Sequence, residues 1–570
     1  MKWYSNMLRS KFALTAAVLF TMVTCVAVDA LAQSASTSDF GIPEVKFINQ
    51  QVRQQWTDYQ IKPSMQATEG EWVRRVYLDI IGRVPTIDEL QAYTSDRDRE
   101  KKVKLVQSLL HDDKYTEEYA KNWTTIWTNV LIGRSGGTER NSLTNREGMQ
   151  KFLRDSFARN KYYNEMVYEL VTATGSNSPG QESFNGAVNF LTMKLEENAT
   201  LATAQTSRIF LGLQVQCTQC HNHPFNEWKQ QKFWEMNAFF RQTRALRRFT
   251  PGTRDVSFVE LINQDFGGEG LTQTPDKADI YYELRNGVTR VAYPVFVDGT
   301  KIDPSGYVED VVRRTELGKL ITESEYMDKM VVNRMWSHFM GYGFTKPIDD
   351  MGPHNPATHP ELVSYLGAQF RQKNYDLKEL ISWIALSESY SLSSRTNSTN
   401  ETVDDPVLGE TPKFSRFYLR QMRAEELYES LVTATQAANG KGSYEEQERR
   451  KGQWLSQFIT AFGNDEGEEG TTFNGTIPQA LMMFNGDLIK TASSKGNGSF
   501  LSNLANDSEL NNTYRQKINH LFLAALARKP STTEVKVANQ LLLARKGELV
   551  AALQDIWWAV LNSNEFILNH

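Results

Sequence analysis

The densest group of reactive side chains in this sequence is the run Cys217-Thr218-Gln219-Cys220-His221. Two cysteines separated by two residues can add to the two vinyl groups of a porphyrin, and the histidine that follows can bind the iron. The sequence therefore predicts a covalently bound haem c, with Cys217 and Cys220 as thioether anchors and His221 as the proximal ligand. The function expected of such a group is electron transfer or a small redox reaction.

The same residues are compatible with two other kinds of site. One is a non-haem metal ion, zinc or iron, bound by both cysteines and by histidine, which would suit an enzyme acting on extracellular polymers. The other is a local disulfide between Cys217 and Cys220, which would make the chain a structural or interaction protein. The candidate metal ligands among the histidines are His221, His223, His338 and His359.

A proline-rich loop, residues 349–360, is the second place where chemistry is expected. It carries His354 and His359 behind two neighbouring aspartates. The alternative is a rigid turn in which Thr358 caps the helix that follows. The sequence leaves this choice open.

Other features limit what the chain does. His338 shares a predicted helix with Trp336 and Phe339, which favours a hydrogen-bonded core residue over a ligand. The sequence has no phosphate-binding glycine loop, no nucleophile elbow and no His-Glu-x-x-His metalloprotease motif. No catalytic residue is therefore predicted, and whether the chain is an enzyme stays open.

The N-terminus has the layout of a secretory signal peptide. Lys2, Arg9 and Lys11 precede an apolar stretch that ends near Val28, and residues 30–32 form a small-x-small cleavage signal. We expect cleavage after residue 32, which gives an exported protein, periplasmic or at the cell surface, without a transmembrane segment. An uncleaved anchor is the alternative. Export agrees with the haem hypothesis, because haem c is attached outside the cytoplasm.

Composition restricts the class of protein further. The formal charge of the chain is −5, and loss of residues 1–32, which carry +2, leaves −7. An acidic chain gives no electrostatic reason to expect nucleic acid or an anionic membrane as a partner. The only cysteine besides the pair is Cys25, in the signal peptide, so this is not a disulfide-stapled scaffold. A mature chain of about 540 residues predicts two to three domains.

Hydrophobic periodicity predicts a mainly α-helical protein of two helical domains joined by a short β-containing segment. The predicted domains are a cytochrome-like helical domain at 43–245, a β-containing connector at 246–308 and a helical C-terminal domain at 309–570. In the first domain, a helix is expected to end at Gly82, and Thr86 with Glu89 predicts a capping box at the next helix start. In the last domain, helices are predicted at 311–341, 359–388, 416–437, 444–462, 508–528, 531–546 and 548–563.

Two long strings of residues resemble a known pair of families. Residues 210–228, which contain the cysteine run, resemble the core of the planctomycete cytochrome C type domain, domain of unknown function 1549. Residues 74–86 resemble the opening helix of that domain and the Gly-x-Pro-Pro-Thr turn that follows it. Val84 stands where that family usually has a proline. Downstream, Val332-Asn333-Arg334-Met335-Trp336-Ser337-His338-Phe339 and His359-Pro360-Glu361-Leu362 resemble domain of unknown function 1553.

This resemblance implies roles for a few residues. It marks Cys217, Cys220 and His221 as the haem-attachment residues. His223, His338, Asp350 and His359 belong to the family motifs without an assigned role. The family name implies a cytochrome-like motif and no particular reaction or redox partner.

Overall fold

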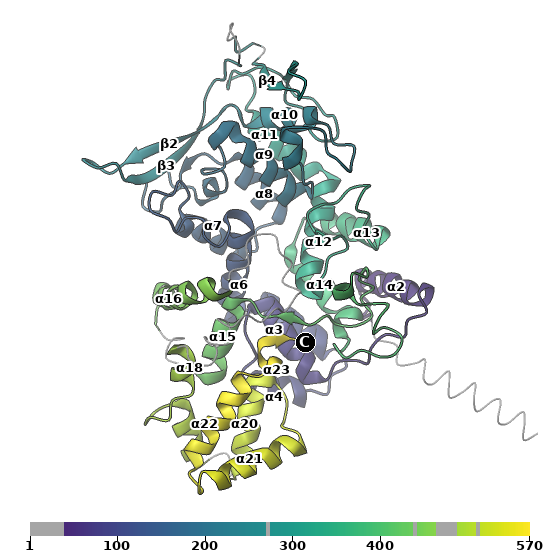
Figure 1. Cartoon of the computed structure of the whole chain (residues 1–570), viewed down its shortest axis with the longest axis vertical. Helices are drawn as coiled ribbons and strands as arrows, with labels where there is room; N and C mark the ends of the chain where they lie inside the picture. The colour runs from purple at the N-terminus through teal and green to yellow at the C-terminus, as the bar shows by residue number, and fades with distance from the viewer. Residues whose placement is uncertain (1–38, 270–273, 277, 437–441, 463–486, 509–512) are drawn as a thin grey trace, which may run out of the picture.

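The computed structural model describes residues 39–269, 274–276, 278–436, 442–462, 487–508 and 513–570. It is mainly helical with a few small sheets, as the sequence predicts. The predicted signal peptide lies outside the described residues. The molecule is elongated, with strands β2–β4 at one end of its long axis and helices α20–α22 at the other (Figure 1).

The first half consists of nine helices within the described residues and three short 3-10 turns. The helices are α2 (Pro43–Asp58), α3 (Glu69–Ile81), α4 (Ile87–Ser95), α5 (Lys101–His111), α6 (Asp113–Ile132), α7 (Arg146–Ala158), α8 (Tyr163–Thr172), α9 (Glu196–Leu211) and α10 (Gln230–Asn237). The 3-10 turns are η1 (Gly186–Phe190), η2 (Gln216–Gln219) and η3 (Ala238–Phe240).

Helix α3 ends and α4 begins as the sequence predicts. Gly82 adopts the left-handed conformation, with φ of 78°, and ends α3. Thr86 and Glu89 form the predicted capping box: the Thr86 side chain accepts from the Glu89 amide, and the Glu89 carboxylate accepts from the Thr86 amide. A second box, formed by Thr68 and Glu71, opens α3.

The β structure of the central segment is antiparallel. Strand β3 (Val256–Asn263) pairs with both β1 (Gly175–Ser176) and β2 (Thr243–Phe249) in a three-stranded sheet. Strands β4 (Ile280–Glu283) and β5 (Thr289–Ala292) form a separate hairpin. β2 begins only two residues after the end of η3, so the sheet follows α10 and η3 closely along the chain.

The second half is again helical, and several predicted helices are divided. Residues 311–341 form α11 (Arg313–Glu323) and α12 (Glu325–Met340), because the Ser324 side chain accepts from the Tyr326 amide and starts a new helix. Residues 359–388 form α13 (Pro360–Gln372) and α14 (Leu377–Ala385), because the Asp376 side chain caps a second helix. Two short 3-10 turns follow, η4 (Ser389–Ser391) and η5 (Pro406–Leu408).

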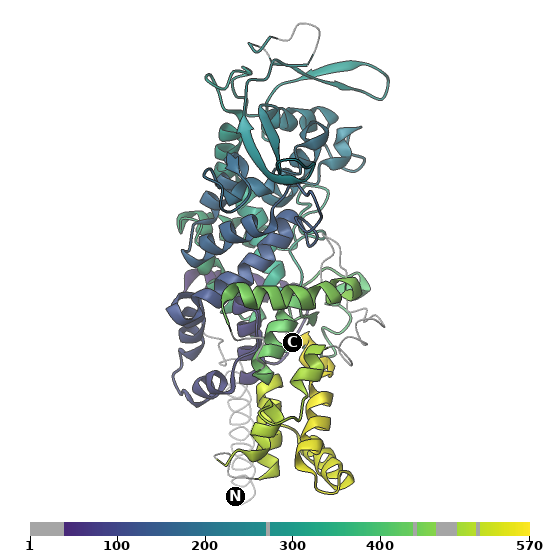
Figure 2. The same cartoon turned by 90° about the vertical axis from the view of Figure 1, so that its left-hand side faces the viewer.

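The remaining helices are α15 (Ala424–Thr435), α16 (Tyr444–Phe462), α18 (Asp487–Ala492), α19 (Phe500–Asn506), α20 (Tyr514–Leu526), α21 (Thr532–Ala544), α22 (Leu549–Leu561) and α23 (Asn564–Ile567). Of these, α15, α16 and α20–α22 overlap the predicted ranges, whereas the short helices α18, α19 and α23 were not predicted. Helix α16 lies across the long axis of the molecule (Figure 2). α15 starts eight residues later than predicted, because the preceding segment is extended and contributes β6 (Arg420–Gln421), which pairs with β7 (Leu568–Asn569).

The two halves share their hydrophobic interior. The largest core cluster contains residues of α2–α9 together with residues of α11–α14, and a second cluster joins Leu78 and Val84 to helices α15 and α18–α23. Helix α3 lies where these clusters meet. Its Arg74 and Arg75 are buried and donate to backbone carbonyls near the C-terminus, including Phe566 O at 2.7 Å and Leu568 O at 3.0 Å.

Candidate functional site

The cysteine run lies on a short turn after α9. Helix α9 ends at Gly212, which is left-handed (φ 67°) and packs so closely that a Cβ there would lie 2.9 Å from Met330 Sδ. The chain then forms η2, in which Thr218 is buried and donates from Oγ1 to Val215 O at 2.6 Å. Because Thr218 faces inward, its neighbour Cys217 is exposed, as is Cys220, and both are free thiols.

Helix α10 fixes the middle of this turn. The carbonyl of Gln219 accepts from the Gln230 side-chain amide and from the Trp234 indole, both at 3.1 Å. Gln230 is buried and also donates to Glu283 O on β4 at 2.9 Å. The spacing between the two thiols is thus set by a turn that a helix and a hairpin both hold.

His221 makes a hydrogen bond of the kind that metal-ligating imidazoles make. Its Nδ1 lies 2.7 Å from the carbonyl oxygen of Asn222. A carbonyl only accepts, so Nδ1 is the donor, and in the neutral ring Nε2 then carries the lone pair. Metal-ligating histidines usually have this arrangement, in which the second ring nitrogen donates to a carbonyl or carboxylate.

His223 has the opposite arrangement. Its Nδ1 accepts from the backbone amides of Phe225 and Asn226, each at 3.2 Å, so the lone pair of that nitrogen stabilises the turn. Burial and the nearby His354 ring, whose centroid is 5.7 Å away, lower the pKa of His223. A neutral His223 therefore holds the loop that follows the cysteine run.

The second place predicted for chemistry, the 349–360 loop, lies beside the cysteine run. Asp349 accepts from the Gln214 side chain at 2.8 Å and lies 3.7 Å from Arg208. The Met351 amide donates to Gly212 O at 2.7 Å. The sequence treats the two places as separate, and the structure joins them through contacts on both sides of Gly212.

Within this loop, Asp350 orients His354 and acts on Cys217. Both carboxylate oxygens of Asp350 lie 3.0 Å from His354 Nε2. Partial burial raises the pKa of the Cys217 thiol, and the negative charge of Asp350 raises it further. The aspartate thus stabilises the protonated form of the first cysteine.

The predicted capping role of Thr358 is wrong. Helix α13 begins after His359, and no side chain caps it; Thr358 Oγ1 lies instead 2.9 Å from His359 Nδ1. The Thr358 amide donates to Phe344 O, which ties the loop to the segment that follows α12. The threonine therefore orients the histidine and leaves the helix start to Pro360, which needs no amide partner.

His338 and His359 are both packed among aromatic side chains. His338 Nε2 lies 3.1 Å from Asp79 O, its ring packs on Trp123, and burial lowers its pKa to about 3. His359 is 4% exposed between Phe344 and Phe414, and burial lowers its pKa to about 4. Within the described residues, no three His, Cys, Asp or Glu side chains meet in a group that could hold a metal ion.

Two arginines beside the loop have unused donors. Among the described residues, Arg208 Nε and both Nε and Nη2 of Arg334 are buried without a hydrogen-bond partner. Burial lowers the pKa of Arg334, and the nearby Asp349 carboxylate opposes that effect. Such donors can pair with carboxylate groups of a ligand. Sequence reasoning missed both residues, although Arg334 lies in one of the family strings.

Comparison with known protein families shows two matches in this chain. Residues 47–245 match the PSCyt2 family, a protein of unknown function (DUF1549), and residues 313–542 match the PSD1 family, a protein of unknown function (DUF1553). The chain is a PSCyt2–PSD1 protein. This confirms both resemblances and their order.

The comparison leaves the reaction of this PSCyt2–PSD1 protein undefined. Both family descriptions state an unknown function, and no curated protein and no solved structure matches the chain. In family terms, the cysteine run belongs to the PSCyt2 region, and the Asp350–His354 loop belongs to PSD1. The candidate site therefore lies where the two families meet. In the described part of the chain, no helix has both the length and the apolar character needed to cross a membrane.

Proposed function

We propose that this PSCyt2–PSD1 protein is an exported c-type haem-binding protein with an electron-transfer or redox role. Cys217 and Cys220 form the thioether anchors, and His221 is the axial ligand. The observation that carries the proposal is the His221 ring: its Nδ1 proton is held by Asn222 O at 2.7 Å, which leaves Nε2 as a lone-pair donor next to two exposed free thiols.

The surroundings of the turn support this assignment. Thioether formation needs thiols that a porphyrin can reach, and both cysteines are exposed on one turn. Haem bound here would supply one-electron chemistry.

The residues of this chain have separate tasks in that arrangement. Asn222 O holds the proton on His221 Nδ1, which keeps the ring in one tautomer and raises the basicity of Nε2. Gln230 and Trp234 hold the Gln219 carbonyl and so the thiol spacing. Asp350 keeps Cys217 as a thiol until attachment. Gln214 and Asp349 hold the PSD1 loop against the segment that leads to the cysteines.

The non-haem metal alternative has less support. It requires further histidines beside the cysteines, and His338 and His359 are packed against aromatic side chains. His223 uses its Nδ1 lone pair within its own turn. Export to the periplasm or cell surface is part of the proposal, and it depends on the N-terminal segment rather than on this site.

The test is expression of the full chain, with its N-terminal segment, in a host that attaches haem c. We expect the exported protein to gain the mass of one haem and to give a pyridine haemochrome spectrum of haem c. The Cys217→Ser/Cys220→Ser double variant should lose the porphyrin, and His111→Gln, an exposed histidine on α5, should retain it.

Each other result has a defined meaning. A correctly exported protein without covalent porphyrin contradicts the proposal. Stoichiometric zinc or iron in that protein would support the metal site, and a mass lower by two hydrogens would support the disulfide.

A further inference from the structure

Strand β2 is an edge strand of the three-stranded sheet, whose order is β1–β3–β2. It pairs with β3 from Thr243, opposite Asn263, to Phe249, opposite Val256. On its other side, no strand and no isolated bridge is paired with it within the described residues. The β2–β3 hairpin projects from the body of the molecule, at the left of Figure 1. One side of β2 is therefore open.

The hydrogen-bonding pattern shows which backbone groups lie on that open side. The Gln264 amide donates to Gln242 O at 2.8 Å, directly before the strand pair begins. Hydrogen-bonded and non-hydrogen-bonded pairs alternate along an antiparallel ladder, so the even-numbered residues of β2 bond to β3 and the odd-numbered residues do not. Val259, opposite Arg247, agrees with this, because its amide and carbonyl bond to Asn177 on the far side of β3. The odd-numbered residues of β2 thus direct their amides and carbonyls outward.

The outward groups of Ala245 and Arg247 are unused. Within the described residues, nothing is hydrogen-bonded to the amide or carbonyl of either residue. The irregularity near the end of the hairpin has its extra residue, Ser257, on β3, so β2 itself stays regular. A strand edge with free amides and carbonyls at every second residue is a template for another strand.

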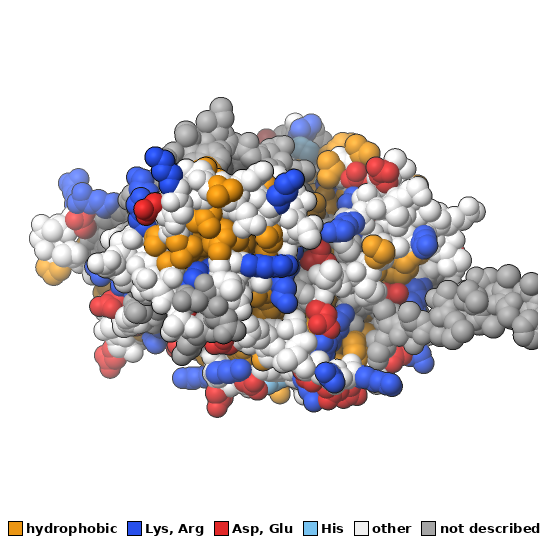
Figure 3. Space-filling view, turned by 90° about the horizontal axis from the view of Figure 1, so that it is seen from below, with side chains coloured by type: hydrophobic (Ala, Val, Ile, Leu, Met, Phe, Trp, Pro, Cys, Tyr) orange, Lys and Arg blue, Asp and Glu red, His pale blue; other side chains and the backbone are white. Residues whose placement is uncertain are grey.

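The hairpin is positively charged in an acidic chain. Residues 243–263 contain four arginines and two acidic residues, which gives a formal charge of +2, whereas the whole chain has −5. Arg244 and Arg254 form no ion pair within the described residues. Lys and Arg side chains are visible on this projection, at the left of Figure 3. The open edge therefore lies in a positive part of the surface.

Two further arginines of β2 are in ion pairs that a partner can replace. Arg247 pairs with Glu196 and Arg248 pairs with Glu260, and 49% of each arginine side chain is exposed. Exposed ion pairs contribute little to stability, so a carboxylate of a partner can take the place of either glutamate at small cost.

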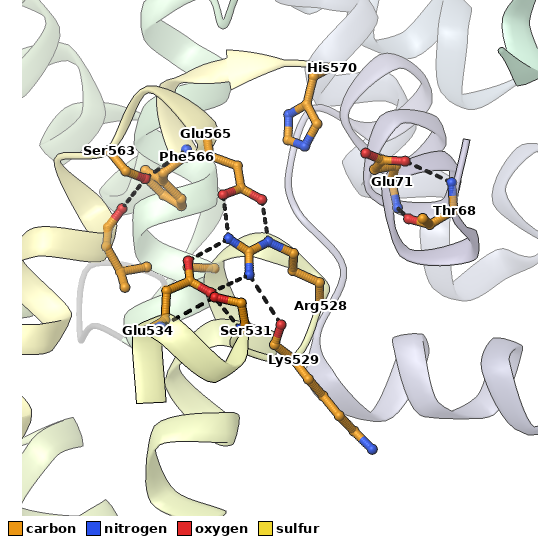
Figure 4. A network of polar contacts seen from close by, with 12 residues as sticks. Thr68, Glu71, Arg528, Lys529, Ser531, Glu534, Ser563, Glu565, Phe566 and His570 are labelled. Atoms are coloured by element: carbon orange, nitrogen blue, oxygen red, sulfur yellow. Dashed lines mark hydrogen bonds and ion pairs between the residues drawn. The ribbon is translucent and has the colours of Figure 1, made fainter. Parts of the chain in front are cut away.

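An arginine at the opposite end of the molecule shows the contrast. Arg528, between α20 and α21, uses all five of its N–H groups: they bond to both oxygens of Glu534, both oxygens of Glu565 and the carbonyl of Lys529 (Figure 4). It has no donor left for a partner. The arginines of β2 keep N–H groups that no acceptor uses within the described residues.

We propose that the outer edge of β2 binds an acidic, extended segment of a partner protein, which adds a fourth strand to the sheet. Backbone hydrogen bonds to Ala245 and Arg247 hold this strand, and they set its register. Arg244, Arg247 and Arg248 pair with its carboxylates, which favours an acidic sequence over others. The proposal is independent of haem, because no residue of the cysteine turn takes part.

A second copy of this chain is a poorer occupant of the edge. When two β2 strands pair antiparallel about Leu246, Arg244 of one strand lies opposite Arg248 of the other, and like charges directly opposite destabilise a strand pair. Arginines on this edge thus oppose self-association and still admit an acidic strand.

The experiment is a fluorescence anisotropy titration of the purified full chain with labelled peptides. The peptides have seven residues, the length of β2, and alternate valine with either glutamate or lysine. We expect the glutamate peptide to bind, with an affinity that falls as salt is added, and the lysine peptide not to bind. Bound glutamate peptide should slow hydrogen exchange of the Ala245 and Arg247 amides. The Leu246 amide should not change, because it already bonds to β3.

Two variants at Arg247 separate the backbone from the charge. Arg247→Pro and Arg247→Ala lose the same charge, but only the proline variant also loses the outward amide, and proline is tolerated where a strand amide faces outward. We expect Arg247→Pro to bind the glutamate peptide about tenfold more weakly than Arg247→Ala. Arg244→Glu should weaken binding about fivefold. The matched control is Arg285→Glu, an exposed arginine in the β4–β5 turn, which should leave binding unchanged.

Several results would overturn the proposal. They are no binding of the glutamate peptide, equal binding of the two peptides, and equal affinity of Arg247→Pro and Arg247→Ala. A concentration-dependent dimer that Arg247→Pro abolishes, without peptide binding, would assign the edge to a second copy. Circular dichroism and unchanged exchange of the Leu246 amide show that each variant keeps its fold and the β2–β3 ladder.

Discussion

His221 and His223 lie two residues apart and have opposite hydrogen bonds at Nδ1. In His221 this nitrogen donates to a carbonyl, and in His223 it accepts from two amides. The difference arises from the backbone: Pro224 has no amide, and the amides of Phe225 and Asn226 turn back toward His223. His223 therefore uses Nδ1 to form its own turn, whereas the hydrogen bond of His221 leaves Nε2 available for the axial role that we propose.

The reactivity of Cys217 tests the influence of the PSD1 loop on the cysteine turn. Burial raises the pKa of this thiol, and the charge of Asp350 adds to the effect. In haem-free protein, Asp350→Asn should therefore increase the rate of Cys217 alkylation by iodoacetamide a few-fold at neutral pH, because more thiolate forms. Peptide mass spectrometry measures the rate. The exposed Asp98→Asn serves as the control, and an unchanged Cys217 rate in Asp350→Asn would contradict the proximity of the loop.

Gln230 tests how strongly α10 supports the turn. This side chain is buried, and its amide donates to Gln219 O and Glu283 O. Gln230→Ala leaves two carbonyl groups without that donor, so we expect a loss of roughly 1–3 kcal/mol in the free energy of unfolding. Urea denaturation gives this value. The control is the exposed neighbour Gln231, whose replacement by alanine should lower the free energy of unfolding by less than about 0.5 kcal/mol. Equal losses in the two variants would mean that Gln230 does not stabilise the turn.

At the scale of elements, Gly82 ends α3 in a position that only glycine fits. Its φ is 78°, and a Cβ there would lie 2.7 Å from Asn122 Oδ1, a side chain that donates to Ile80 O at 3.1 Å. Gly180 has a similar φ of 87° with open space around it. Alanine is strained by the positive φ at both positions, but only at Gly82 does its Cβ also clash with Asn122. Gly82→Ala should therefore destabilise the protein by about 1–3 kcal/mol more than Gly180→Ala. Thermal denaturation compares the two variants, and equal losses would exclude the steric argument.

The start of α13 should make stability depend on pH. Burial lowers the pKa of His359 to about 4, below its usual 6.5, so the unfolded chain takes up this proton first as the pH falls. The stabilisation from the neutral ring is complete above pH 6.5 and is lost as the pH falls toward 4. Up to about 2 kcal/mol should disappear between pH 7 and pH 5 from this residue. His359→Phe should remove that part of the dependence in urea titrations at the two pH values.

The control for this pH experiment is His111→Phe, which alters an exposed histidine. It should change the pH dependence much less than His359→Phe. If His359→Phe retains the full loss of stability between pH 7 and pH 5, the buried neutral ring is not its source.

At the scale of the whole molecule, the sequence predicted local structure well and long-range contacts poorly. The capping box at Thr86 and the stop at Gly82 were predictable because they depend on residues within one turn. The contact between Gly212 and Met351 was not, because hydrophobic periodicity does not report which segments 139 positions apart meet. The role of Thr358 was mistaken for the same reason: its partners depend on how α12 packs.

The overall charge also concealed a local one. A chain of formal charge −5 still has regions of different local charge: near α21, Glu534 and Asp555 are paired with arginines, whereas Glu548 and the neighbouring lysines form no ion pair within the described residues. The net charge of the chain is a sum over all of its surfaces, and a partner contacts only one of them. The sign of the charge on one surface depends on which of its charged side chains are in ion pairs.

The shared core predicts that the two family regions unfold together. Asp79 on α3 is fully buried and pairs with Arg420, and it accepts from Tyr390 at 2.6 Å and Asn569 at 2.8 Å, all three in the C-terminal half. Removal of this carboxylate breaks a buried ion pair and leaves Arg420 with only the nearby Glu426 as a counter-charge, so Asp79→Ala should cost about 3–5 kcal/mol. Because both core clusters touch α3, calorimetry should show one transition that moves to lower temperature as a unit. The exposed Asp58→Ala on α2 should leave it in place. Two separated transitions in the wild-type protein would mean that the PSCyt2 and PSD1 regions are independently stable, and that the contacts of Asp79 do not couple them.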